Sequence, residues 1–273
     1  LVELLRSADS AAHENATRAL WYLATWPANQ LAIAHAGGVP PLIKMLSGES
    51  ERGQEWGAAA LEALSHGCPE NQVALSRAGA IQPLVMLLGS DGDEVQKYAQ
   101  GALLNIASAS EGNLREVVKA LVALLDVRNA GAQMKSAESL AILAAKSVVN
   151  RGAIAALGAI PPLVRLLGDG RNVNKSQVRA AAALSDLARS SENKQAIVNA
   201  GGLNALVMML RSSNVEAQTR ASGALAHLSA STSAQKLIAD ADGIALLVAL
   251  LSSERLAAAN HAGCALYHLA SMT

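Results

Sequence analysis

The chain repeats one pattern of hydrophobic and polar positions along its whole length. A leucine-rich run with helical spacing recurs, and the first leucines of these runs are Leu1, Leu42, Leu84, Leu121, Leu163, Leu206 and Leu247. Neighbouring members of this series are 37 to 43 residues apart. A period of this size is typical of stacked helical repeats. The pattern therefore predicts an all-α protein built from similar units.

The stretch GAIPPLVRLL, residues 158–167, shows how one unit joins two helices. Gly158 can adopt the left-handed conformation that caps the end of a helix. Proline fixes φ near the helical value and lacks an N–H that would have no partner in the first turn. The stretch therefore predicts one helix that ends at the glycine and a second that begins at the prolines.

Each full unit contains three apolar segments, as in residues 193–198, 204–210 and 215–230. The third is the longest and follows a polar turn. Its Ala221, Ala224 and Leu225 fall on one helical face, as does Leu228. A single unit of this kind cannot bury its apolar faces alone, so neighbouring units must stack.

This three-helix unit, with NKQAIVNAG (residues 193–201) leading into the second helix, resembles the armadillo repeat. HEAT repeats are the nearest alternative, but they have two helices and lack the glycine turn. The resemblance covers essentially the whole chain and implies a right-handed superhelix whose third helices line a concave groove. We expect a single domain with units at residues 1–27 (partial), 28–69, 70–110, 111–147 (degenerate), 148–191, 192–232 and 233–273.

Two places depart from the regular pattern. In the fourth unit, residues 110–125 (SEGNLREVVKALVALL) lack the usual first helix and its glycine turn, so we expect that helix to be missing or fused. At the ends, Leu1 begins in a second helix and the chain finishes on an apolar third helix. Because solenoids need polar caps, we expect the native protein to continue beyond this sequence or to stack end to end.

Composition narrows the function classes. The formal net charge is zero, which gives no bulk attraction to nucleic acid or to a membrane surface. The two cysteines, Cys68 and Cys264, argue against a disulfide framework and favour a reducing compartment such as the cytoplasm. No uninterrupted apolar run reaches the length of a membrane span.

The armadillo resemblance directs attention to the exposed stripe of the third helices, where the family holds its ligands. One column of that stripe is usually asparagine, which pairs with the backbone of an extended peptide; here it reads Tyr22, Ala63, Asn105, Ile142, Asp186, His227 and His268. A second column is tryptophan in repeats of the importin-α type; here it reads Arg18, Ala59, Gly101, Glu138, Ala182, Gly223 and Cys264. Only Asn105 keeps the family residue, so nuclear import of cargo is a less favoured function.

A third column changes character along the chain. It reads Asn15, Trp56, Tyr98, Lys135, Arg179, Arg220 and His261, so rings are followed by cations. All six aromatic residues of the chain lie on or at the end of a third helix, and tyrosine and tryptophan are common interface anchors. We predict anchoring roles for Tyr22, Trp56 and Tyr98. For Trp21 and Tyr267, packing between repeats is an equally good interpretation, and Trp26 precedes Pro27, where it could simply cover the turn.

The cations Lys135, Arg179 and Arg220 form a basic track that is similar to the β-catenin type of groove, which receives acidic extended segments. The alternative is that they are solvated charges paired with neighbours such as Glu138. Exposed ion pairs contribute only about 0–1 kcal/mol each, so stability alone gives little reason for three cations in line.

No catalytic constellation, cofactor motif or metal-ligand set is recognisable, and His227, His261 and His268 lack a cysteine or carboxylate that would complete a metal site. We therefore predict a non-enzymatic scaffold, without a cofactor or metal, that binds an extended or partly helical protein segment. The alternative is a structural element of a larger array, stacked through its ends. The predicted partner-binding surface comprises Arg18, Tyr22, Trp26, Trp56, Tyr98, Asn105, Lys135, Glu138, Arg179, Asp186, Arg220, His227, His261, Tyr267 and His268.

Overall fold

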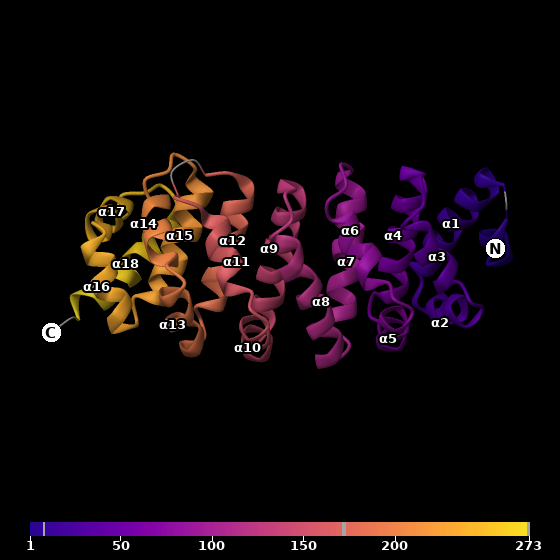
Figure 1. Ribbon diagram of the computed structural model, residues 1–273, viewed down its shortest axis with the longest axis horizontal. Helices are drawn as coiled ribbons and strands as arrows, with labels where there is room; N and C mark the ends of the chain where they lie inside the picture. The colour runs from indigo at the N-terminus through magenta and orange to yellow at the C-terminus, as the bar shows by residue number, and fades with distance from the viewer. Residues whose placement is uncertain (8, 171–172, 272–273) are drawn as a thin grey trace. The chain divides into compact units, whose positions relative to one another are not determined.

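The computed structural model describes residues 1–7, 9–170 and 173–271 (Figure 1). The regular structure of these residues consists of α-helices and one 3-10 helix, with no strand. The predicted all-α fold is therefore confirmed. Among the same residues, no helix is both long enough and apolar enough to span a bilayer.

The chain divides into two compact units, Leu1–Lys135 and Ser136–Thr273, and the division falls within helix α9 (Ala130–Lys146). The other helices of the first unit are η1 (Glu3–Arg6), α1 (Ser10–Ala24), α2 (Pro27–His35), α3 (Val39–Met45), α4 (Glu51–Ser65), α5 (Pro69–Arg77), α6 (Ile81–Leu87), α7 (Asp93–Ala107) and α8 (Glu111–Leu125).

The helices of the second unit follow in sets of three, two short and one longer. They are α10 (Val148–Ala156), α11 (Ile160–Leu167), α12 (Lys175–Leu187), α13 (Ser191–Asn199), α14 (Gly202–Met209), α15 (Val215–Leu228), α16 (Thr232–Asp240), α17 (Gly243–Leu250) and α18 (Leu256–Ala270).

The third helices of successive repeats pack directly against one another. In the first unit α4 packs between α1 and α7, and in the second unit α15 packs between α12 and α18. Small side chains allow this close approach: the run Ala58, Ala59 and Ala60 in α4 is fully buried together with Leu61. Residues on consecutive third helices can therefore reach each other across one unit.

The glycine turns and proline starts are confirmed. Gly37, Gly79, Gly158 and Gly201 all have φ of 80° or 81°, in the left-handed region that only glycine enters at no steric cost. Prolines occupy the first turn of α3 and of α11. At the corresponding turn before α17, Asp242 adopts φ of 59°, which aspartate tolerates better than most residues.

The irregular fourth unit contains one helix in place of two. Helix α8 is continuous for 15 residues and is capped by the preceding Ser110, whose hydroxyl accepts a hydrogen bond from the Asn113 N–H. Because neither glycine nor proline interrupts residues 113–125, nothing ends the helix where the turn would stand. This agrees with the expectation of a missing or fused first helix.

Asparagines near the start of the first helices close the ends of the preceding third helices. Their side-chain amides donate to the last backbone carbonyls of those helices, which have no partner within the helix. The donors are Asn29, Asn71, Asn113, Asn150 and Asn193. These bonds fix the direction of each third helix relative to the next repeat.

Replacing Asn71 by alanine is expected to lower the free energy of unfolding by about 1–3 kcal/mol. Asn71 is buried, and its amide lies 2.9 Å from the Leu64 carbonyl oxygen, which the substitution would leave buried without this donor. Urea denaturation followed by circular dichroism measures the change. Asn199, which is exposed, is the control, and Asn199→Ala should change stability by less than about 0.5 kcal/mol. Equal effects of the two substitutions would contradict the capping role.

Candidate partner-binding surface

Four rings from three successive third helices meet in the first unit. The Trp21 ring centroid lies 4.5 Å from that of Tyr22, 5.2 Å from that of Trp56 and 6.0 Å from that of Tyr98. We call Trp21, Tyr22, Trp56 and Tyr98 the ring cluster. Trp21 and Tyr22 come from the last turns of α1, Trp56 from α4 and Tyr98 from α7. Such contact distances are typical of favourable aromatic pairs.

The ring cluster is open to solvent. Tyr22 is 58% exposed, and the other three rings are half-buried. Trp21, which was not among the predicted site residues, contacts all three of the others. Aligned columns missed it because they assign each side chain to the position of its own Cα. A long helical side chain leans toward the N-terminus of its helix, and we attribute the reach of Trp21 to Trp56 to this direction.

Three carboxylates act electrostatically on Tyr98 of the cluster. Glu62 on α4 is half-buried, and burial raises the pKa of its carboxyl, although the positive charges of His66 and Lys97 oppose that change. Burial also raises the pKa of the Tyr98 hydroxyl, and the charges of Glu94, Glu55 and Glu62 act in the same direction. The electrostatic environment of Tyr98 is therefore mainly negative.

One cation of the chain already lies on the cluster. The Lys97 Nζ is 5.6 Å from the centroid of the Tyr98 ring, and it forms an ion pair of 3.1 Å with the exposed Glu94 carboxylate. A cation this close to an aromatic face is attracted by the quadrupole of the ring. The contact shows that the cluster can hold a positive group.

Asn105, predicted to bond a partner's backbone, makes hydrogen bonds within the chain. Its amide nitrogen lies 3.3 Å from the Glu62 carbonyl oxygen and 3.2 Å from the Ser65 hydroxyl. These bonds join α7 to the C-terminal end of α4. The amide hydrogens of Asn105 therefore serve the contact between repeats, and its bond to a partner's backbone stays a prediction.

The remaining predicted residues of the first unit are dispersed. Trp26 is 70% exposed at the junction between α1 and α2, outside the ring cluster and outside any third helix. Arg18 is exposed on α1, one turn before Tyr22. Lys135 is half-buried on α9.

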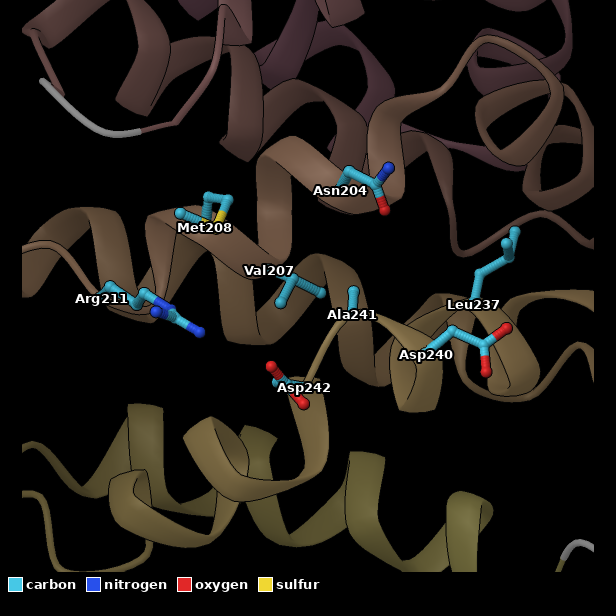
Figure 2. A pocket seen from close by; sticks show the side chains of 8 residues that line it. All are labelled: Asn204, Val207, Met208, Arg211, Leu237, Asp240, Ala241 and Asp242. Atoms are coloured by element: carbon cyan, nitrogen blue, oxygen red, sulfur yellow. The ribbon is translucent and has the colours of Figure 1, made fainter.

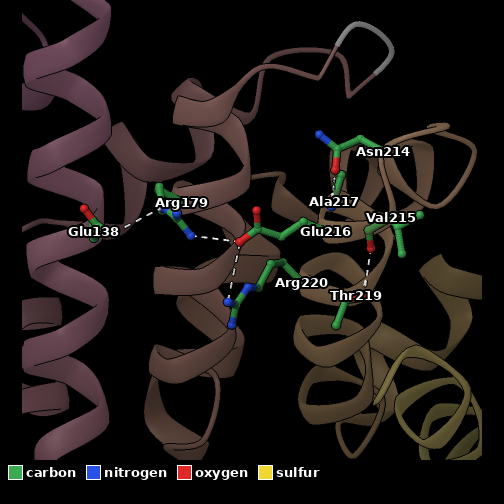
Figure 3. Close-up of polar contacts among 8 residues, drawn as sticks. All are labelled: Glu138, Arg179, Asn214, Val215, Glu216, Ala217, Thr219 and Arg220. Carbon is green, nitrogen blue, oxygen red and sulfur yellow. Dashed lines mark hydrogen bonds and ion pairs between the residues drawn. The ribbon is translucent and has the colours of Figure 1, made fainter. Parts of the chain in front are cut away.

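In the second unit the predicted cations are paired with carboxylates (Figure 3). Arg179 on α12 lies 2.8 Å from Glu216 on α15 and 3.5 Å from Glu138 on α9. Arg220 lies 3.6 Å from the same Glu216 oxygen. The sequence left two interpretations open for these arginines, contact with acidic side chains of a partner or pairing with neighbours such as Glu138. The structure pairs Arg179 with Glu138 and both arginines with Glu216. Glu216 was missed, although its place four residues before Arg220 is the spacing of a helical ion pair.

Asp186 and His227 extend this surface toward α18. Burial raises the pKa of the half-buried Asp186 carboxyl, with Arg189 acting in the opposite direction, and the two side chains lie 3.8 Å apart. Burial lowers the pKa of the His227 imidazole, and the charges of Arg189 and His261 lower it further. His227 is therefore disposed to be neutral.

The aromatic and histidine residues of α18 have different environments. The Nδ1 atom of His268 lies 3.1 Å from the Ser229 hydroxyl, and its ring lies 5.7 Å from that of Tyr267. The Nδ1 atom of His261 is buried without a hydrogen-bond partner among the described residues. Tyr267 is 75% exposed on α18.

Concave features elsewhere arise from the stacking of repeats. One cavity has a volume of about 530 Å³. Figure 2 shows the residues that line it, which belong to α14, α16 and the adjoining turns: Asn204, Val207, Met208, Arg211, Leu237, Asp240, Ala241 and Asp242. Similar openings lie between α6 and α8 and between α3 and α5. None of these is on a third helix. Within the described residues, no group of three or more histidine, cysteine, aspartate or glutamate side chains could hold a metal ion.

Comparison with known proteins identifies the repeats. Residues 68–108 and 190–230 match the Armadillo/beta-catenin-like repeat family. The chain is 36% identical to an engineered protein of known crystal structure, covering 99% of this chain and 67% of that one with a TM-score of 0.75. The chain belongs to the armadillo-repeat family. Its fold is that of armadillo-repeat solenoids.

Two further structures of armadillo proteins are similar to this chain. A computationally designed armadillo repeat protein for modular peptide recognition is 26% identical over 84% of this chain and 99% of its own, with a TM-score of 0.64. A designed armadillo repeat protein in complex with the peptide (KR)4 is 29% identical over 83% of this chain and 97% of its own, with a TM-score of 0.63. No curated protein matches this armadillo chain.

Proposed function

We propose that the chain is a non-enzymatic scaffold that binds an extended or partly helical segment of a partner protein on its third helices. The ring cluster is the observation that carries this proposal. Rings that served only as core filler would be buried, yet Tyr22 is 58% exposed and the other three are half-buried. Tyrosine and tryptophan give large, rigid contact area at low cost in conformational entropy.

The arrangement of the rings suits an extended ligand. They come from α1, α4 and α7, so a segment that crosses these helices would contact several rings in succession. Binding such a segment costs side-chain and backbone entropy, which many modest contacts and a few aromatic anchors can offset. The relatives designed for peptide recognition, or solved with the peptide (KR)4, support a peptide as the ligand class. We place the protein in the cytoplasm on the basis of its cysteine usage.

In the second unit, the proposal that Arg179 and Arg220 receive acidic side chains takes a modified form. Glu216 already contacts both arginines, so an acidic side chain must displace it. We expect Glu216→Gln to strengthen binding of an acidic peptide of alternating Glu and Gly by about 3- to 10-fold, because a carboxylate competes for an arginine far better than an amide does. Fluorescence polarisation measures the change. Weaker binding to the variant would contradict this role.

A peptide selection tests the proposed function. A displayed peptide library is selected on the immobilised chain and, in parallel, on the double variant Tyr22→Ala/Trp56→Ala, with Trp26→Ala as the matched control. We expect a common sequence motif on the unmodified chain and on Trp26→Ala, and its loss on the double variant. Thermal unfolding must show that all three proteins are folded. Enrichment of the same motif on all three would contradict the anchoring role.

An exposed apolar face favours a second candidate, the repeat array stacked through its ends. Three apolar residues of the second helix α14 and its end are at most 3% exposed, whereas their counterparts 41 residues later at α17 are 43–51% exposed. The buried residues are Leu203, Val207 and Leu210, and their exposed counterparts are Ile244, Val248 and Leu251. This face is the one that internal repeats use to bind their neighbours.

Sedimentation velocity over a concentration series tests the array. The array predicts that the average mass rises with concentration and that Val248→Asp abolishes the rise. A concentration-independent monomer mass would exclude self-stacking through this face.

A further inference from the structure

Glu62 is a half-buried carboxylate on α4, the third helix that packs between α1 and α7. It lies in the last turn of α4. Its Cγ atom occupies the space above Gly101 of α7, at 2.8 Å from where a Cβ of residue 101 would be. The absence of a side chain at Gly101 therefore lets the Glu62 stem lie across α7. Among the described residues, the Glu62 carboxylate has no hydrogen bond and no ion pair.

The ionised form of the Glu62 carboxylate is only partly stabilised by its surroundings. Burial disfavours its charge and raises the pKa of the Glu62 carboxyl, while the charges of His66 and Lys97 compensate only in part. A buried charge is stable when it is paired and hydrogen-bonded. Neither His66 nor Lys97 forms an ion pair with Glu62, so the carboxylate retains capacity for a cation.

The ring cluster adds a second attraction for a cation. In the repeat pattern Glu62 stands 41 residues after Trp21, so it holds in α4 the place that Trp21 holds in α1. Lys97 already lies over Tyr98, so one ring of the cluster already contacts a positive group. Aromatic faces and a desolvated carboxylate attract the same kind of group, a cation.

From this juxtaposition we infer that the first unit binds a lysine or arginine side chain of the partner segment, held by the Glu62 carboxylate and the rings of Trp21 and Tyr98. This inference rests on the proposed function and specifies its ligand. The site does not use the tryptophan column of importin-α-type repeats, which here reads Arg18, Ala59 and Gly101. Arg18 lies one turn before Tyr22, and its positive charge repels a second cation there. We therefore expect the partner's cation beside Glu62 and Tyr98.

Peptides of matched length provide the test. The probes are an eight-residue peptide of alternating Lys and Arg, its neutral counterpart of alternating norleucine and citrulline, and an acidic peptide of alternating Glu and Asp. Glu62→Gln keeps the shape of the side chain and removes its charge. It should fold normally, because an ionised Glu62 is disfavoured by burial. The matched control is Glu94→Gln, which alters an exposed carboxylate already paired with Lys97.

We expect the unmodified chain to prefer the basic peptide to its neutral counterpart, and Glu62→Gln to weaken binding of the basic peptide by about 5- to 10-fold, as expected for loss of one charge-assisted contact. Binding of the neutral peptide should stay within about 2-fold for both variants, and Glu94→Gln should weaken the basic peptide by less than about 2-fold. The difference between the unmodified chain and Glu62→Gln should also diminish as the pH falls toward 4.5 and Glu62 is protonated.

Two outcomes would overturn the inference: no binding of the basic peptide, or an equal effect of Glu62→Gln on basic and neutral peptides. The double variant Tyr22→Ala/Trp56→Ala separates this failure from that of the proposed function. If the double variant weakens binding of all peptides while Glu62→Gln has no charge-dependent effect, the scaffold proposal stands and only the cation site is wrong.

Discussion

Replacing Gly170 by alanine is expected to lower the free energy of unfolding by about 3 kcal/mol or more. Gly170 has φ of 71°, a conformation that costs a residue with a Cβ about 1–2 kcal/mol. A Cβ at this position would overlap the backbone oxygen of Ala205 and would lie 3.0 Å from the Met208 Cβ. Backbone atoms of α14 cannot yield as a flexible side chain can, so the overlap adds a steric penalty.

The matched control is Gly152→Ala in α10, for which we expect the opposite sign. Gly152 lies inside a helix, and an added Cβ would meet nothing within 4 Å. Alanine in a helix interior is favoured over glycine by about 0.5–1 kcal/mol, so this variant should be more stable than the unmodified chain. Urea unfolding of the three proteins measures both effects. Equal destabilisation by both substitutions would contradict the left-handed conformation and close packing of Gly170.

Replacing Trp21 by alanine is expected to weaken binding of a selected partner peptide by about 30-fold, which corresponds to about 2 kcal/mol. Trp21 contacts the other three members of the ring cluster, so its loss removes one contact surface and the support of Tyr22 and Trp56. Fluorescence polarisation with a labelled peptide measures the affinity.

Trp26→Ala is the control for Trp21→Ala, because it removes the same side chain from an exposed position outside the cluster. Its effect on affinity should be less than about 2-fold. Because Trp21 is half-buried, its variant could also lose stability, and thermal unfolding must show that it is folded at the assay temperature. Comparable losses of affinity in the two variants would contradict a specific anchoring role.

The repeat architecture could be predicted because its signals are local. Gly158 adopts the left-handed turn, the prolines that follow it begin α11, and the uninterrupted residues of α8 form one helix. Each of these features depends on the backbone preferences of a few neighbouring residues. The period of the leucines then predicted that the units stack, since every unit must cover the apolar face of the next.

The binding surface could be predicted only in part, because its contacts cross between helices. The third-helix stripe located three members of the ring cluster, but the reach of the Trp21 side chain depends on the spacing between α1 and α4. In the same way Asn105 bonds to the end of α4, and Arg179 pairs with Glu216 on α15. A column of aligned positions shows which residues share a face of the helices. It does not show which of them already form hydrogen bonds or ion pairs with other residues of the chain.

The three tryptophans of the chain provide the most direct test of the central claim, that the ring cluster binds the partner. Each indole N–H gives a separate signal in a two-dimensional ¹H–¹⁵N NMR spectrum, and single-tryptophan variants assign the three signals. On titration with a selected peptide, we predict that the indole signals of Trp21 and Trp56 change in chemical shift and that the Trp26 signal stays unchanged. Saturable binding that shifts only Trp26, or none of the three indoles, would contradict it.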